Sequence, residues 1–486
     1  MGEVSVTGRE IPTPHRGVSE VVPARGGGAT RVPVDSAWLA TTLSALAERH
    51  QVPGAQLAVH QGGATVAVEV EVGELEHGSG IPVTRETAFP IGSISKAWTA
   101  TLAMILVADG DLELDAPLEE HLPELDDLGG QLTLRQLLSH TSGFATSPDL
   151  PELPTLSLRR YVREHCRRHS LVLPPGTGFS YSTRNYVLIG HLIETITGMS
   201  WWEAMVSILL RPLGVEPAAV LGSMRAPSGR PVATGHSVNS ALGRVRPVQQ
   251  SLTLADAPAG ALAVSAVDLV ALGLMHVGPG VPALLPADWA ERMRQAVPDA
   301  DPFGLADGWG PGLAVFRDGD TDWFGHDGNA NGTSCYLRID PIGGWVVALT
   351  TNASTGSYLW EELLAELHQV GLPLGAPRRD MVPQVPVAPP TDCVGTYVNG
   401  PTEYLVTAAG TGGLCLANGS ELIARLAFYD EMHFVLQDLT SDRGLHTGRF
   451  LRDPATKQVE QLQIGGRLAQ RRWQPAVPEA RSPAIP

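Results

Sequence analysis

The chain has 486 residues, a formal net charge of −17 and a pI near 5.3, and 43% of its residues are hydrophobic. This length exceeds one ordinary domain, so we expect two. The acidic balance argues against nucleic acid as a partner, because phosphate contacts need clustered Lys and Arg.

The first residues show no basic segment followed by an apolar core, so we expect no export and a cytoplasmic protein. The longest apolar run, about 97–108, is shorter than the roughly 20 residues that cross a bilayer, so we expect no membrane partner. The four cysteines lie far apart without C-x-x-C spacing, and no His/Asp/Glu set has the spacing of metal ligands. We therefore expect reduced thiols, no metal and no cofactor.

Residues 1–33 are rich in Gly, Pro and Val without periodicity, which predicts a flexible N-terminal tail. The first folded domain is predicted at 34–372. It begins with a helical pattern, "SAWLATTLSALAERH", and continues with three short strand patterns, "GAQLAVH", "ATVAVEVEVGELE" and "TAFPIG". From about 96 to 256 the pattern is helical and rich in loops.

Strand patterns resume at "GTSCYLRID" and "WVVALTTN", which the turn "PIGG" joins into a predicted hairpin, and "LWEELLAELHQVG" predicts a closing helix. Strands on both sides of a helical insertion predict one α/β (α+β) domain, with an antiparallel sheet assembled from both ends of its sequence. The Pro-rich stretch 373–390 is a predicted linker. Short strands separated by turn residues predict a small antiparallel β domain over 391–480, either a lipocalin-like barrel or a sandwich.

The segment "FPIGSISKAW" contains a candidate nucleophile and base. Ser93 and Lys96 lie three positions apart at the start of an apolar helical pattern, so they share one face. Lys96 is one of only two lysines among 34 basic residues. An arginine keeps its proton at any relevant pH, whereas a buried lysine can lose it and deprotonate a serine. Lowering a lysine pKa from about 10.4 to near 7 needs roughly 4–5 kcal/mol, which burial near positive charge supplies.

Four further segments accompany this S-x-x-K motif in order: "LTLRQLLSHTSG", "PPGTGFSYSTRNYVLIG", "AGALAVSAVDLVALG" and "GHDGNANG". Together they resemble the penicillin-recognising serine enzymes, in particular the class C β-lactamase-like branch, over about residues 36–370. The resemblance implies a β-lactamase/transpeptidase-like fold and an acyl-enzyme formed on Ser93.

The resemblance also implies roles for residues outside the S-x-x-K motif. Tyr181 in "YST" would relay protons as phenol or phenolate. The family usually has Tyr-x-Asn here, and the hydroxyl of Thr183 cannot offer a substrate the paired donor and acceptor of an amide. His326, Asp327 and Gly328 match the His-x-Gly motif, in which the glycine would let the substrate approach the backbone.

Backbone N–H groups of Ser93 and Asn329 would form the oxyanion hole. The segment "HTSG" at 140–143 is interpreted as a structural turn beside the site. Ser265 with Asp268 is interpreted as a helix-capping pair rather than a second nucleophile.

Five arginines lie within "LRRYVREHCRRH" at 158–169 of an otherwise acidic chain. A solvated helix face is one interpretation. The other is a docking patch for an acidic peptidyl carrier protein that presents a thioester-linked substrate.

The chain most resembles penicillin-binding-protein-type thioesterases, which release and macrocyclise nonribosomal peptides. The resemblance implies a peptidyl thioester or ester substrate ending in a D-residue, whose own amine displaces Ser93. A β-lactamase-like esterase or a D-stereospecific peptidase that hydrolyses a small ester or amide is the alternative. Because Thr183 replaces the usual asparagine, a catalytically inactive binding module is the alternative from another class.

Overall fold

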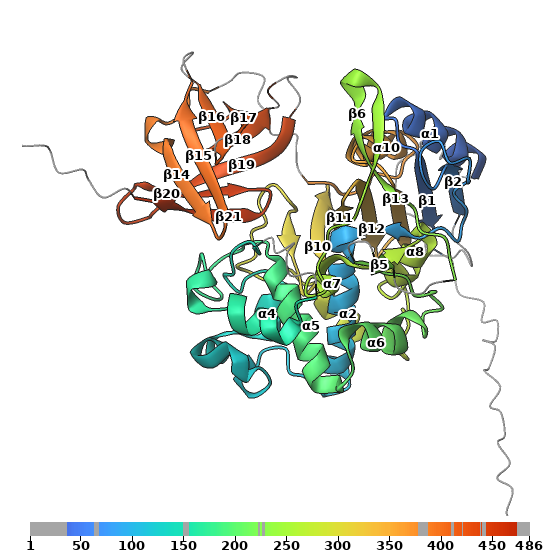
Figure 1. Ribbon diagram of the computed structural model, residues 1–486, viewed down its shortest axis with the longest axis horizontal. Coiled ribbons are helices and arrows are strands. Elements are labelled where there is room, and N and C mark those ends of the chain that lie inside the picture. The colour runs from blue at the N-terminus through green and yellow to red at the C-terminus, as the bar shows by residue number, and fades with distance from the viewer. Residues whose placement is uncertain are drawn as a thin grey trace, which may run out of the picture.

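The computed structural model describes residues 36–473, apart from 63–67, 149–154, 222–223, 226–228, 378–386, 410–412, 420, 438 and 440–443. The predicted tail at 1–33 lies outside the described residues, as does the middle of the predicted linker. Two units lie side by side in Figure 1: a sheet surrounded by helices, and a barrel formed by the C-terminal strands.

The first unit is built on a seven-stranded antiparallel sheet. In sheet order the strands are β2 (Val68–Gly73), β1 (Gly54–His60), β13 (Trp345–Thr351), β12 (Thr333–Asp340), β11 (Thr321–Ala330), β10 (Ala314–Asp318) and β9 (Gly308–Trp309). β1 pairs with β13, which confirms that both ends of this part of the sequence contribute to one sheet. Every residue of β12 is buried, because both faces of the sheet are covered.

Three short strand pairs lie outside this sheet. They are β3 (Phe89–Pro90) with β8 (Ala263–Val264), β4 (Val220–Leu221) with β5 (Met224–Arg225), and β6 (Gly235–Asn239) with β7 (Arg244–Val248). The strand pattern in "TAFPIG" therefore forms a local pair beside the helical insertion instead of a sheet strand.

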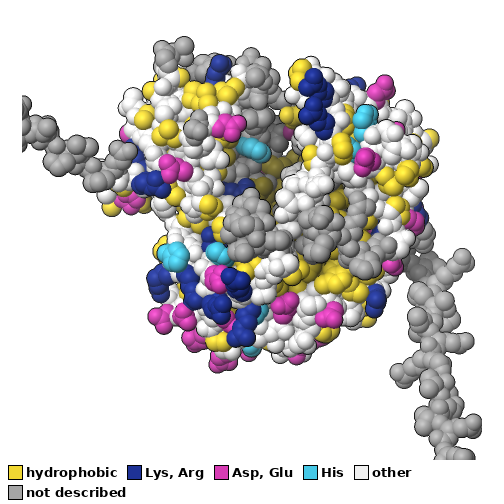
Figure 2. All heavy atoms as spheres, viewed as in Figure 1, with side chains coloured by type: hydrophobic (Ala, Val, Ile, Leu, Met, Phe, Trp, Pro, Cys, Tyr) yellow, Lys and Arg dark blue, Asp and Glu magenta, His cyan; other side chains and the backbone are white. Residues whose placement is uncertain are grey.

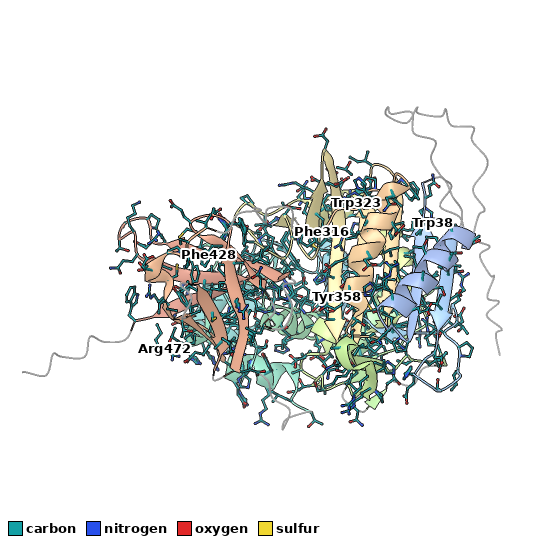
Figure 3. All side chains as sticks on the ribbon, turned by 90° about the horizontal axis from the view of Figure 1, so that it is seen from above. Trp38, Phe316, Trp323, Tyr358, Phe428 and Arg472 are labelled. Carbon is teal, nitrogen blue, oxygen red and sulfur yellow. The ribbon has the colours of Figure 1, made fainter. Side chains whose placement is uncertain are left out.

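Helices cover both faces of the sheet. The described helices of the first unit, including those of the helical insertion, are α1 (Ser36–Arg49), α2 (Ser95–Ala108), α3 (Leu134–Leu138), α4 (Leu158–His165), α5 (Thr183–Thr197), α6 (Trp201–Ala204), α7 (Ala257–Gly260), α8 (Ala266–Leu274), α9 (Ala287–Arg294) and α10 (Gly356–Gln369). α1 and α10 lie side by side on one face, where Trp38 and Tyr358 mark them in Figure 3. α8 contacts the other face. No helix in the described ranges is long and apolar enough to cross a membrane.

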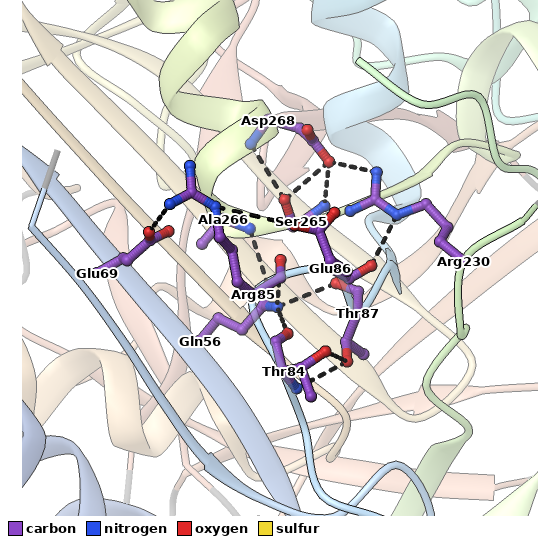
Figure 4. A network of polar contacts seen from close by, with 10 residues as sticks. All are labelled: Gln56, Glu69, Thr84, Arg85, Glu86, Thr87, Arg230, Ser265, Ala266 and Asp268. Atoms are coloured by element: carbon purple, nitrogen blue, oxygen red, sulfur yellow. Dashed lines mark hydrogen bonds and ion pairs between the residues drawn. The ribbon is translucent and has the colours of Figure 1, made fainter. Parts of the chain in front are cut away.

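A buried polar network fixes the N-terminus of α8 (Figure 4). Ser265 and Asp268 form the capping box that the sequence predicted. Asp268 Oδ2 also lies 2.7 Å from Nη1 of Arg230, whose side chain is 5% exposed. The side-chain oxygen of Gln56 on β1 accepts the N–H of Ala266, so the network ties α8 to the sheet.

We expect Asp268→Ala to lower the free energy of unfolding by about 3–5 kcal/mol, because the buried Arg230 guanidinium loses its carboxylate. Urea unfolding followed by circular dichroism measures the change. The double variant Arg230→Met/Asp268→Leu is the matched control, since two apolar side chains leave no buried charge, and it should recover most of the loss. An equal loss in both variants would contradict this explanation.

The second unit is a closed antiparallel barrel, one of the two forms that the sequence predicted. Its strands are β14 (Gly395–Asn399), β15 (Thr402–Ala408), β16 (Leu414–Asn418), β17 (Glu421–Phe428), β18 (His433–Gln437), β19 (Gly444–Arg452), β20 (Val459–Ile464) and β21 (Arg467–Arg472). β14 pairs with β21, so the barrel has no free edge. Phe428, Phe434 and Phe450 contact one another in its core. The strand patterns from which the sequence predicted this domain end at "GRFLRD", so they do not include β20 and β21.

The turn between these two missed strands holds the barrel against the first unit. Gly465 and Gly466 both have positive φ, at 51° and 72°, as a tight two-residue hairpin turn requires. The carbonyl oxygen of Gly466 accepts the N–H of Tyr181 at 2.9 Å, and its own N–H donates to the carbonyl oxygen of Phe303 at 3.0 Å. The turn therefore brings Arg467, the residue that follows it, beside Tyr181.

Candidate active site

Ser93 lies in the 3₁₀ turn Gly92–Ile94, immediately before α2, and Lys96 is the second residue of that helix. Lys96 Nζ lies 3.1 Å from Ser93 Oγ, so the two side chains meet as the sequence predicted. Gly92 has a φ of 51°, and a Cβ there would lie 2.2 Å from the carbonyl oxygen of Asn329. The turn that carries Ser93 is thus pressed against the backbone of β11.

Lys96 is buried in the position that a base needs. Its side chain is 1% exposed, and Nζ also lies 3.0 Å from the carbonyl oxygen of Ala259. Burial and, secondly, the positive charge of Arg467 lower the pKa of Lys96 to about 7, while the charge of Asp256 opposes the shift. A large fraction of the Lys96 side chain is therefore a neutral amine at neutral pH, able to accept the Ser93 proton.

Tyr181 completes the group around the serine. Burial raises the pKa of Tyr181 to about 12, although a hydrogen bond with Ser93 and the charge of Arg467 act to lower it. Lys96 Nζ lies 5.2 Å from the centre of the tyrosine ring. Tyr181 is therefore a neutral phenol at neutral pH, which excludes the phenolate as its resting form and suits it to pass a proton to a leaving group.

The ring of His140 packs against the ring of Tyr181. Its ring centre lies 4.2 Å from that of Tyr181, and its Nδ1 accepts the N–H of Ser182 and the side-chain amide of Asn185. Burial and the charge of Lys96 hold the pKa of His140 well below its usual range. The sequence predicted a structural turn beside the site at "HTSG", and these contacts show in addition that His140 packs against Tyr181.

His326 lines the same cavity as Tyr181. Its Nδ1–H donates to the carbonyl oxygen of Asp327 at 2.6 Å, which leaves Nε2 as an acceptor. Burial, and after it the charge of Lys96, lower the pKa of His326 to about 3, so this imidazole is neutral. The carboxylate of Asp327 pairs with the buried Arg338, with Oδ1 2.5 Å from Nη1. The predicted substrate contact of Asp327 is therefore restricted by an internal ion pair.

Gly328 is needed for a different reason from the one predicted. A Cβ at this position would lie 2.0 Å from the carbonyl oxygen of Ile91 and 2.9 Å from the backbone nitrogen of Ile94. The glycine therefore admits the backbone of the Ser93 turn. The next residue, Asn329, lies at the edge of the site, where its N–H and that of Ser93 remain the predicted oxyanion donors.

Two cavities meet at Ser93 and Asn329. The barrel-side cavity has a volume of about 480 Å³ and is lined by Tyr181, His326, Arg467 and apolar barrel side chains. The helix-side cavity has a volume of about 450 Å³ and is lined by Lys96, Thr183 and the segment before α7. Ser93 can therefore face an acyl group in one cavity and an acceptor in the other. The predicted site residues are all brought together except Gly328, which faces protein backbone.

Sequence reasoning missed Arg467. Its guanidinium carbon lies 5.3 Å from the centre of the Tyr181 ring, and it is the described cation that most lowers the pKa of Lys96. The local signal was available in part: "VEQLQIGGRLAQRR" alternates apolar and polar residues around Gly-Gly, which is typical of a hairpin. Nothing in that pattern indicates that the hairpin lies beside a serine more than 350 residues earlier.

We expect the rate of acyl-enzyme formation to rise with pH through about 7 and then to level off. Lys96 must lose its proton before it can act, so each unit below pH 7 should reduce the rate about tenfold. Tyr181, with its pKa of about 12, should impose no falling limb below pH 10. Labelling of Ser93 by a fluorophosphonate, timed from pH 5 to 10, measures the profile. A rate independent of pH over that range would contradict the assignment of Lys96 as base.

We expect Arg467→Gln to move this rising limb to higher pH, because removing a neighbouring positive charge favours protonated Lys96. Labelling at pH 6.5 should then slow several-fold, while labelling at pH 9 changes little. Arg467→Lys keeps a positive charge and is the matched control, which should retain most of the wild-type profile. An unchanged limb in Arg467→Gln would show that the barrel has no electrostatic part in the site.

A serine with a buried neutral lysine and a phenol, and backbone amides beside them, defines a serine acyl-transfer site. In the described ranges no His/Cys/Asp/Glu cluster able to hold a metal is found. The four cysteines are free thiols, three buried and one half-buried. The sequence model of the Beta-lactamase family matches residues 39–369, so the chain belongs to this family of serine hydrolases.

Individual proteins agree with this assignment. Penicillin-binding protein 4 of Amycolatopsis lactamdurans is 35% identical over 389 residues, which cover 75% of this chain and 98% of that protein. The crystal structure of SurE has 41% identity and a TM-score of 0.78, covering 90% of this chain and 99% of SurE, and SurE has also been solved with D-Leu. D-amino acid amidase from Ochrobactrum anthropi SV3, at 24% identity and a TM-score of 0.55 over 68% of this chain and 99% of its own, shares the fold.

Proposed function

We propose that this chain transfers a peptidyl group from a thioester or activated ester to Ser93 and then to the amine at the other end of the same peptide. The product is a macrocyclic peptide. The observation that carries the proposal is that Ser93 lies between two cavities, one of which is lined in part by side chains of the barrel.

In the first step Ser93 Oγ attacks the acyl carbon and its proton passes to Lys96 Nζ. The N–H groups of Ser93 and Asn329 stabilise the oxyanion. The bond to the thiol breaks, the thiol leaves with the proton held by Lys96, relayed by the phenol of Tyr181, and the acyl group remains as an ester on Ser93.

In the second step the peptide amine attacks this ester, and Lys96 takes the proton that the amine loses. The bond to Ser93 Oγ breaks and the serine regains a proton through Tyr181. His326 Nε2 is a buried acceptor in the barrel-side cavity with no described partner, so it is placed to accept a hydrogen bond from the incoming N–H. After the second step Ser93, Lys96 and Tyr181 carry the same protons as before the first, so the enzyme is regenerated.

Cyclisation competes with hydrolysis, and the barrel favours cyclisation. Leu416, Leu436 and Ile464 of the barrel line the barrel-side cavity, in which the amine would bind, and there they limit the room for water. The positive charge of Arg467 in the same cavity disfavours an ammonium, so an attacking amine is held in its reactive neutral form. Because SurE has been solved with D-Leu, we propose that the residue attached to Ser93 has the D configuration.

A direct test incubates the full chain with a linear peptide thioester ending in a D-residue and analyses the products by mass spectrometry. The cyclic peptide should exceed the hydrolysed acid. The matched substrate ending in the L-residue should react at least about tenfold more slowly. Hydrolysis alone would replace the proposal with a hydrolase, and the absence of product and of an adduct on Ser93 would refute catalysis.

A D-stereospecific peptidase is the second candidate. The Arg467 guanidinium in the barrel-side cavity would also suit the carboxylate of a departing amino acid. The same enzyme preparation given a peptide that ends in two D-residues with a free carboxylate separates the two functions. Release of the last residue, with no cyclic product from the thioester, would favour the peptidase.

A further inference from the structure

The hairpin β6–β7 projects from the first unit (Figure 1). Its base is held firmly, because the Gln250 side chain exchanges hydrogen bonds with the backbone of Asn331, just beyond Asn329 on the same chain segment. His236 N–H also donates to the carbonyl oxygen of Gly332. The base of the hairpin is therefore tied to the segment that borders Ser93.

The base of this hairpin forms one side of the approach to Ser93. Gly235 and Val248 line a third cavity of about 400 Å³. This cavity shares Pro90, Val220 and Gln250 with the helix-side cavity that contains Ser93. The two cavities are therefore neighbours, and together they extend from the base of the hairpin to the nucleophile.

One face of the hairpin carries unneutralised positive charge. Arg244 and Arg246 alternate along β7, so both point from the same face, and both are exposed. Neither guanidinium pairs with a carboxylate in the part of the chain that the structure describes. At about 3.3 Å per residue, Arg246 lies roughly 7 Å and Arg244 roughly 13 Å along the strand from Val248. Figure 2 shows basic side chains gathered at this place, beside the hollow between the hairpin and the barrel.

The arginine-rich segment at 158–169 differs in this respect. Arg159 pairs with Glu124, Arg160 pairs with Glu164, and Arg167 pairs with Asp126. Most of its charge is therefore neutralised within the chain, which favours the solvated helix face over the docking patch. The hairpin tip also presents Leu242, 61% exposed, beside its free arginines, and apolar contact with a charged border is typical of protein interfaces.

We propose that the basic face and tip of the β6–β7 hairpin, formed by Leu242, Arg244 and Arg246, dock an acidic carrier protein that presents the thioester-bound peptide on a flexible arm. This inference rests on the proposed function. A carrier bound there would direct its arm into the two neighbouring cavities that extend from Val248 to Ser93. The basic face would complement the charge of an acidic carrier, although this chain as a whole has a net charge of −17.

The test compares two donors of one D-terminal peptide: its thioester on an acidic carrier domain, and its N-acetylcysteamine thioester. For Arg244→Glu/Arg246→Glu we expect kcat/KM to fall at least about tenfold with the carrier-bound donor, mainly through KM, and less than twofold with the small thioester. Raising the salt concentration should reduce the wild-type preference for the carrier-bound donor. Arg163→Glu/Arg168→Glu, on the other arginine-rich segment, is the matched control and should leave both donors unchanged.

The outcomes separate the two proposals. If the wild-type chain turns over neither donor, the proposed function fails and the docking site fails with it. If the small thioester reacts but the hairpin variant uses the carrier-bound donor normally, only the docking site is refuted. An equal loss on both donors would show damage to the two cavities rather than to a docking surface, and a loss confined to the control variant would place the carrier on 158–169.

Discussion

Ser93→Ala is expected to abolish covalent labelling and to reduce turnover of a peptide thioester by about 10⁴-fold or more. Ser93 is the hydroxyl that lies 3.1 Å from the neutral amine of Lys96 and at the junction of the two cavities. Without its oxygen no ester can form, and only binding and the backbone amides would assist attack by water. Intact-mass spectrometry after incubation with a fluorescent penicillin or a fluorophosphonate measures the adduct directly.

Ser251→Ala is the matched control for this experiment. Ser251 carries another hydroxyl in the lining of the helix-side cavity, but it lies outside the Lys96 contact. This variant should label at the wild-type rate. Labelling that survives in Ser93→Ala and disappears in Ser251→Ala would overturn the assignment of the nucleophile.

The fold was largely predictable because the main elements have strong local signals. The β12–β13 hairpin has a turn rich in Gly and Pro between two apolar strands, and α10 has helical apolar spacing. "TAFPIG" does form a strand, but its partner could not be predicted, because two paired residues, Phe89 and Pro90, leave too little pattern to indicate one. The pairing with β8 is decided by packing of the helical insertion, which no local pattern expresses.

The residues of the site also separate into those that the sequence could predict and those that it could not. Ser93 and Lys96 could be found because their chemistry depends on spacing within one turn, and Tyr181 and His326 followed from the family resemblance. The reason for Gly328 could not be found, since the backbone that it admits comes from Ile91, more than 200 residues away in sequence. Arg467 was missed because its role depends on how a second domain docks.

Lys96→Met is expected to slow acylation of Ser93 by about 10²–10⁴-fold, the usual contribution of a positioned base. Methionine has a similar volume without a titratable group, so the cavity keeps its shape. The rising limb of the pH profile near 7 should disappear along with most of the rate, because that limb belongs to the Lys96 amine. Timed labelling with a fluorophosphonate from pH 5 to 10 measures both effects.

The same substitution is expected to make the protein more stable. The pKa of Lys96 is about 7 in the folded chain and about 10.4 in the unfolded chain, so the unfolded state holds more protons between these values. Burial of this amine therefore costs stability fully below pH 7, progressively less as pH rises, and nothing above about 10.4. After allowing about 1 kcal/mol for the lost hydrogen bonds, we expect Lys96→Met to raise the free energy of unfolding by about 3–4 kcal/mol at pH 7.

Urea unfolding at pH 7 and pH 10 measures this difference, which should shrink to below about 1 kcal/mol at the higher pH. Lys457→Met, at the only other lysine of the chain, is the matched control. Lys457 is exposed on the barrel, so its replacement should change stability by less than about 0.5 kcal/mol at either pH. If Lys96→Met is no more stable than the wild type at pH 7, folding does not lower the pKa of the Lys96 amine. Lys96 would then lack the neutral form that the proposed catalysis requires.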